Sequence, residues 1–126
     1  MTHAFIREFC LQKKGVTEEF PFDSETLVFK VMNKMFLLTG LETLPVRINL
    51  KCDPELAVEL REKYQAVTPA FHMNKTHWNS VEDDGSIPQQ EIIQMIDHSY
   101  QLVVAGLSKK IRQQLEELPP ASSTAN

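Results

Sequence analysis

The chain has 126 residues, of which 42% are hydrophobic and 24% are charged, and this composition suits a single globular domain. Its net charge of −4 and pI of about 5.5 disfavour tight, non-specific binding to nucleic acid, but they leave room for a local basic patch. No apolar run approaches roughly 18 residues and no signal peptide is visible, so we expect a cytoplasmic protein with no membrane partner and with Cys10 and Cys52 reduced.

The N-terminal residues predict a helix followed by a short strand. Residues 3–13 carry apolar side chains at helical spacing, and Gly15 is expected to end this helix. Residues 18–23 are expected to form an edge strand, because Pro21 lacks the N–H group that an inner strand needs.

The next segment predicts a hairpin and a further strand. Residues 27–32 and 35–39 are rich in strand-forming side chains, and we expect Asn33-Lys34 to be the turn between them. Residues 46–51 alternate apolar and polar side chains, which predicts a sheet with one covered face and one solvated face.

The sequence Asp53-Pro54-Glu55 predicts a helix start, with an N-cap acid followed by proline at the first helical position. Its buried stripe is expected to consist of Leu56, Leu60 and Tyr64, which recur every four residues. A further strand is expected at residues 78–81.

The C-terminal part predicts two helices. Ser86 and Gln89 have the spacing of a capping box, which would open a long helix reaching about Leu107. Residues 109–118 follow as a final short helix, and Pro119-Pro120 ends it. The element order predicts an α+β fold in which helices pack on one face of an antiparallel sheet, with an N-terminal helix and two C-terminal helices. We expect one domain, residues 1–118, and a disordered tail, residues 119–126.

The run His72-Met73-Asn74-Lys75-Thr76-His77-Trp78 contains two of the four histidines and the only tryptophan. It resembles the signature of the MmcQ/YjbR family, and the resemblance extends over roughly residues 1–118. Further matching segments, in the same order, are Phe29-Lys30-Val31, Lys34-Met35-Phe36, Leu50 to Glu55, Asp84 to Pro88, and Asp97-x-Ser99-Tyr100.

The resemblance implies a frataxin-like (CyaY-like) α+β sandwich whose hairpins are proposed as paired wings for DNA. We therefore expect basic side chains on the exposed sheet face and hairpin tips to contact phosphates without reading sequence. Asn74, His72 and His77 would shape the loop. The candidate DNA-binding residues are Lys30, Lys34, Arg47, Lys51 and Lys75.

An alternative is a module for a protein or small-molecule partner, in which the motif lines a pocket. The pocket residues would be His72, Asn74, Lys75, His77 and Trp78. The sequence leaves open whether Trp78 is a core residue, which is commoner, or a platform for stacking a base.

Metal binding and catalysis receive less support from the sequence. His72 and His77 with Asp83 or Asp84 are conceivable ligands, but their spacing fits neither a helix nor one strand face. The commoner role for such imidazoles is hydrogen bonding to the backbone. We see no phosphate-binding glycine loop and no Cys–His pairing, so we expect no metal, no cofactor and no enzymatic activity.

Overall fold

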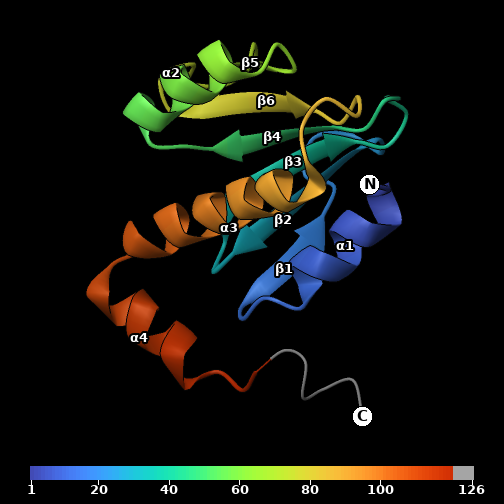
Figure 1. The fold of residues 1–126 in the computed structure, drawn as a ribbon. Helices are drawn as coiled ribbons and strands as arrows, with labels where there is room; N and C mark the ends of the chain where they lie inside the picture. Colours follow the sequence, from blue (N-terminus) through green and yellow to red (C-terminus); the bar gives the residue numbers. More distant parts are fainter. Residues whose placement is uncertain (121–126) are drawn as a thin grey trace.

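The computed structural model describes residues 1–120, which form a six-stranded antiparallel sheet and four helices, so the predicted α+β class is confirmed (Figure 1). The strand order across the sheet is β1-β2-β3-β4-β6-β5. The strands are β1 (Val16–Glu19), β2 (Thr26–Val31), β3 (Lys34–Gly40), β4 (Arg47–Lys51), β5 (Val67–Pro69) and β6 (Trp78–Glu82). The helices are α1 (His3–Leu11), α2 (Pro54–Lys63), α3 (Gln89–Ala105) and α4 (Lys109–Glu117).

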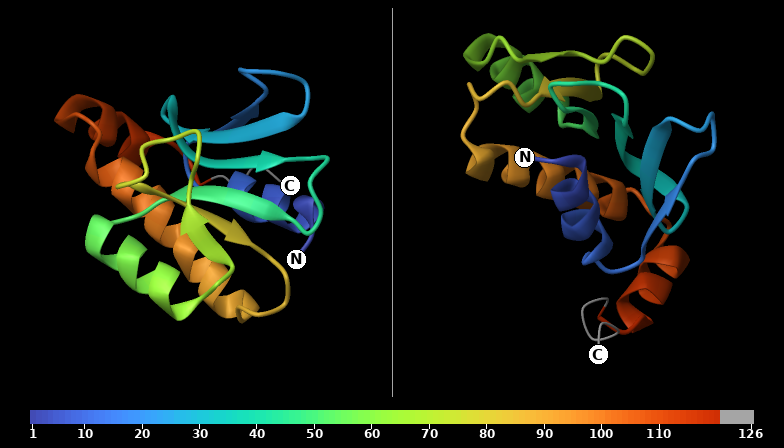
Figure 2. Two further views of the ribbon diagram at one scale, coloured as in Figure 1. Left: turned by 90° about the horizontal axis from the view of Figure 1, so that it is seen from above. Right: turned by 90° about the vertical axis from the view of Figure 1, so that its right-hand side faces the viewer.

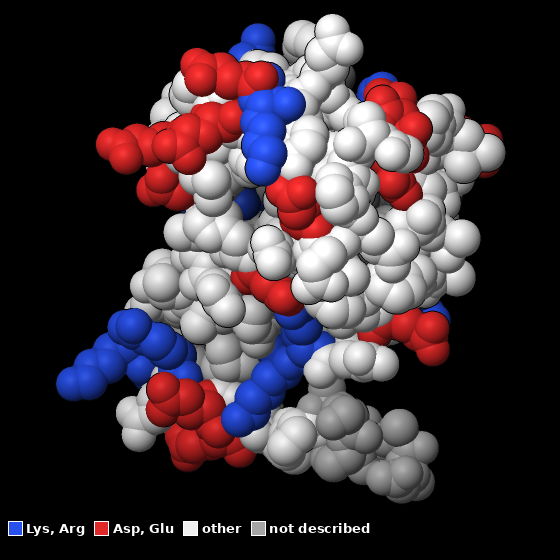
Figure 3. All heavy atoms as spheres, in the orientation of Figure 1, with Lys and Arg blue, Asp and Glu red and all other residues white. Residues whose placement is uncertain are grey.

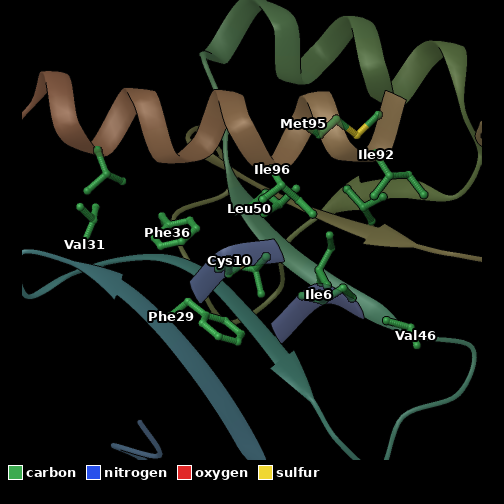
Figure 4. Packing of buried hydrophobic residues seen from close by; sticks show 14 of the residues in the cluster. Ile6, Cys10, Phe29, Val31, Phe36, Val46, Leu50, Ile92, Met95 and Ile96 are labelled. Carbon is green, nitrogen blue, oxygen red and sulfur yellow. The ribbon is translucent and has the colours of Figure 1, made fainter. Parts of the chain in front are cut away.

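Three helices cover one face of the sheet, which we call the inner face. The views in Figures 1 and 2 place α1, α2 and α3 on this side, and α3 crosses the strands diagonally. The main hydrophobic core fills the space between these helices and the sheet (Figure 4). Its fully buried side chains include Ile6, Phe29, Phe36, Leu37, Leu50, Ile92 and Ile96. None of the helices within residues 1–120 is both long and apolar enough to cross a membrane.

Local sequence determines β4 and the start of α2 as predicted. Val46, Ile48 and Leu50 are buried, and the alternation continues through β4. Asp53 caps α2, because its carboxylate accepts hydrogen bonds from the backbone N–H groups of the helix's first turn. The predicted stripe of α2 is only half-buried, with Leu60 and Tyr64 packed against the main core, and Ala57 is the fully buried residue of the helix.

The first strand and the hairpin turn lie earlier in the chain than predicted. The edge strand β1 begins at Val16 and ends at Glu19, so Pro21 lies in the loop that follows. The turn of the hairpin is Met32-Asn33, whose φ angles are +48° and +70°. Positive φ at both central residues is the geometry that matches the twist of a two-residue hairpin. Lys34 therefore belongs to β3, where it pairs with Val31.

The predicted capping box at the start of α3 does not form. The helix begins at Gln89, and its N-cap residue, Pro88, makes no side-chain capping hydrogen bond. The Ser86 hydroxyl donates instead to Asp84 Oδ1, at 2.5 Å, within the preceding turn. The short Asx-type turn competes with capping for the serine side chain. The tail predicted for residues 119–126 lies outside the described residues from 121 onward.

Candidate functional site

The motif segment, residues 70–77, folds over the outer face of the sheet and covers part of it. A second, smaller hydrophobic cluster forms there from side chains of β2, β3, the first residue of β6 and the segment itself. Its members are Val28, Leu38, Ala70 and Trp78, with Met35 and Met73 packed against them. The outer face, expected to be solvated, is therefore partly buried by the motif.

Asn74 shapes the loop, as expected. Its side-chain Oδ1 accepts a hydrogen bond from Thr76 N at 2.9 Å, and its carbonyl accepts from His77 N and Trp78 N. Trp78 is only 9% exposed and packs within the outer cluster. Its role is thus that of a core residue, and a ring this buried offers no stacking platform to a base.

Arg61 fastens the motif to α2, a role that sequence reasoning missed. Its Nε donates to Asn79 Oδ1 at 2.7 Å, and its Nη2 donates to the Lys75 carbonyl at 2.5 Å. The buried Asn79 amide in turn donates to the Ala57 carbonyl within α2, at 3.4 Å. A guanidinium presents several donors in one plane, which suits it to join a helix, a strand and a loop.

The two motif histidines are exposed, and neither imidazole makes a hydrogen bond within the described chain. Hydrogen bonds from Asn74 and Arg61 fix the shape of the loop, a role that was also expected of His72 and His77. The conceivable metal ligands do not converge either, because Asp83 pairs with the N-terminal amine at 2.9 Å. Among residues 1–120, no three histidine, cysteine or acidic side chains come close enough to hold a metal ion.

Two of the five predicted DNA contacts are neutralised on the outer sheet face. Lys30 Nζ lies 2.7 Å from Glu19 Oε1, and Arg47 Nη2 lies 3.1 Å from Glu82 Oε2. The cross-strand register sets both pairs, because Lys30 and Arg47 each lie beside an acidic strand neighbour on the same face. Their charge therefore contributes little to a phosphate-binding surface.

The other three predicted cations have no acidic partner among residues 1–120, and they lie toward one end of the sheet. Lys34 begins β3 and Lys51 ends β4, and both line a hollow of about 310 Å³ beside Leu107. Lys51 pairs with Trp78, so the motif loop carrying Lys75 leads into the same end of the sheet. Lys75 Nζ lies 5.5 Å from the centroid of the Phe71 ring.

Two further lysines, at the start of α4, extend this basic region. Lys109 and Lys110 follow Leu107 closely in the chain and make no ion pair with a described residue. Figure 3 shows basic side chains where α3 meets α4, with acidic side chains of α4 beside them and a further acidic group over α2. The sequence signal for this region was the pair Lys109-Lys110, which follows the predicted end of the long helix and was not counted among the candidate DNA-binding residues. We call the resulting surface the lysine end: Lys34, Lys51, Lys75, Lys109 and Lys110.

A second hollow, of about 640 Å³, lies on the outer face beside the motif. Its lining mixes apolar side chains such as Phe22 and Met73 with polar ones such as Asn49 and His72. Trp78 lines the hollow at the lysine end instead. The five residues expected to bound one pocket are therefore not brought together, because His72 and Trp78 line different hollows.

Comparison with known proteins places the chain among relatives of similar length. The YjbR family model matches residues 11–102. The YjbR protein of Escherichia coli strain K12 is 34% identical over 119 residues, which cover 94% of this chain and all of that protein. YyaQ of Bacillus subtilis strain 168 is 33% identical over 76 residues, which cover 60% of this chain and 63% of the relative.

Two solved structures resemble the fold. The crystal structure of the Deinococcus radiodurans protein DR2400 superimposes with a TM-score of 0.87 at 39% identity, covering 94% of this chain and 90% of that one. A Pseudomonas syringae crystal structure gives a TM-score of 0.69 at 28% identity, covering 81% of this chain and 98% of that one. These likenesses establish the family and the fold.

Proposed function

The chain belongs to the YjbR family, and we propose that it is a non-enzymatic binding protein of the cytoplasm that contacts the phosphates of DNA through the lysine end. One observation carries this proposal. The three candidate cations that lack an acidic partner are those toward one end of the sheet, and the first residues of α4 add two more lysines near it.

The chemistry of the lysine end fits phosphate contact better than base recognition. Ammonium groups on flexible stems meet phosphates as point charges, and they release counterions from the duplex when they do so. Within residues 1–120, Trp78 is buried, and Lys30 and Arg47 on the outer face are paired with acids, so these residues do not form a base-reading surface. We therefore expect binding that depends on salt and varies little with DNA sequence.

The experiment is a fluorescence anisotropy titration of a labelled duplex over a series of salt concentrations. Affinity should fall as salt rises, and Lys34→Ala or Lys51→Ala should each reduce the slope of log K against log salt by about one. Lys30→Ala is the matched control, because Glu19 already neutralises Lys30. Absence of binding at low salt, or an equal loss in the Lys30 variant, would refute the proposal.

A second candidate function is the binding of a small molecule in the outer-face hollow. The observation that favours it is a volume of about 640 Å³ with both apolar and hydrogen-bonding side chains in its lining. A thermal-shift screen of metabolites distinguishes the two functions. Stabilisation by one compound that His72→Ala abolishes, together with no response to duplex DNA, would favour the small molecule.

A further inference from the structure

A separate hollow of about 160 Å³ lies on the inner face, between α2 and α3 and over β4 and β6. Apolar side chains form most of its walls, and a few polar groups stand among them. The apolar members of the lining are Leu50, Cys52, Leu56, Leu60, Val81 and Met95, and the polar side chains are Asn79, Glu91, Gln94 and His98.

The hollow exists because α2 packs loosely against its neighbours. Ala57 is the helix's fully buried residue, whereas Leu56 and Leu60 face the hollow and stay half-buried. Polar links bridge the gap instead: the Tyr64 hydroxyl at the end of α2 donates to Glu91 of α3. Protein interiors are normally close-packed, and an apolar cavity of roughly 150 Å³ is large enough to take up a benzene ring.

The one thiol in the wall of the hollow, Cys52, is not activated. Burial raises the pKa of the Cys52 thiol to about 11, with Asp53 adding to the effect, so the thiol is protonated at neutral pH. Strand alternation turns the Lys51 side chain toward the outer face, so this residue contributes backbone to the inner lining. The site therefore suits binding rather than covalent chemistry.

Glu91 supplies an oriented negative charge at the hollow. Its Oε1 accepts from Tyr64 Oη at 2.5 Å and from Lys63 Nζ at 3.3 Å, while its Oε2 accepts no hydrogen bond within residues 1–120. The bond from Tyr64 is the main reason that the pKa of Glu91 is lowered, which keeps this carboxylate ionised. The Glu91 side chain is 33% exposed, so its Oε2 faces solvent and can accept from a ligand at the mouth of the hollow.

We propose that this hollow binds small primary amines, with the alkyl or single-ring group between Leu60 and Met95 and the ammonium donating to Glu91 Oε2. The volume limits the apolar part to about the size of a benzene ring. Near the hollow, Lys63 is the positively charged side chain that competes for the carboxylate, and because it is 63% exposed, solvent screens its ion pair with Glu91. A charge-assisted hydrogen bond to an ionised acceptor gives the amine its advantage over a neutral ligand.

The test compares three probes that share one alkyl group: 3-methylbutylamine, 3-methylbutan-1-ol and 3-methylbutanoate. Each is titrated into isotope-labelled full-length protein, and NMR shift changes are followed at residues lining the hollow. The amine should bind about three- to tenfold more tightly than the alcohol, and the acid most weakly. Glu91→Gln should lower amine affinity to that of the alcohol while leaving alcohol binding unchanged.

Two tryptophan variants on α2 complete the design. Leu56→Trp should fill the hollow and abolish the shifts with the amine and the alcohol, whereas Val58→Trp, at an exposed position of the same helix, should leave them intact. Amide spectra without ligand establish that each variant is folded. Equal binding of acid and amine, an unchanged amine affinity in Glu91→Gln, or no response to any probe would overturn the proposal.

Discussion

Ser99 joins α3 to two strands, and its removal gives a sharp test of how the sheet end is held. The side chain is fully buried, its hydroxyl donates to the Phe36 carbonyl at 2.6 Å, and its oxygen accepts from Lys51 N at 2.9 Å. Phe36 lies where the β2–β3 register shifts, so its carbonyl is served by this serine. The same hydroxyl fixes the end of β4 at Lys51, within the lysine end.

Ser99→Ala should therefore leave two backbone groups without partners. Each unsatisfied buried group costs about 1–3 kcal/mol, so the expected loss for the two groups is about 2–6 kcal/mol of unfolding free energy. Urea denaturation followed by circular dichroism measures it, with Ser24→Ala in the exposed β1–β2 loop as the control. A loss below about 0.5 kcal/mol would show that these backbone groups find other partners and would refute the reasoning.

Three further predictions concern backbone strain, acid stability and thiol reactivity. Gly15→Ala should destabilise by at least about 1 kcal/mol in urea denaturation, because φ is +75° and a Cβ would lie 2.4 Å from Leu115 Cδ1; an unchanged midpoint would contradict this. Backbone hydrogen bonds lower the pKa of Asp23. The contribution of Asp23 to stability is therefore present above the unfolded pKa and lost as pH falls through the folded pKa. The loss of unfolding free energy caused by Asp23→Asn should shrink as the pH is lowered, and a loss that stays constant with pH would contradict this. Burial raises the pKa of Cys10 to about 12 and that of Cys52 to about 11, so iodoacetamide should label the native protein slowly at mildly alkaline pH and the urea-unfolded protein fast, as mass spectrometry would reveal.

Short-range patterns predicted the elements that neighbouring residues determine. The helix start at Asp53 depends on a carboxylate reaching backbone groups two and three residues away, and the alternation of β4 depends on burial of one face. The hairpin turn was misplaced by one residue, because methionine rarely adopts the positive φ that Met32 has. The predicted capping box did not form because the Ser86 hydroxyl donates to Asp84, two residues earlier in the chain.

The candidate site depended on contacts that no short-range pattern encodes. Lys30 lost its role as a free cation because β1 brings Glu19 beside it, and the same holds for Arg47 and Glu82 across the β4–β6 pair. The link from Arg61 to the motif likewise joins residues that only the folded chain brings together. Family resemblance identified the motif, but the strand register decided which lysines stayed unpaired.

The most direct test of the lysine end is an NMR shift map of the full-length protein with a short DNA duplex. Backbone shifts should concentrate at Lys34, Lys51, Lys75 and the first turn of α4, and they should shrink as salt is raised. Shifts gathered over the acidic helix α2, or none at low salt, would contradict the proposal that this end of the sheet contacts phosphates.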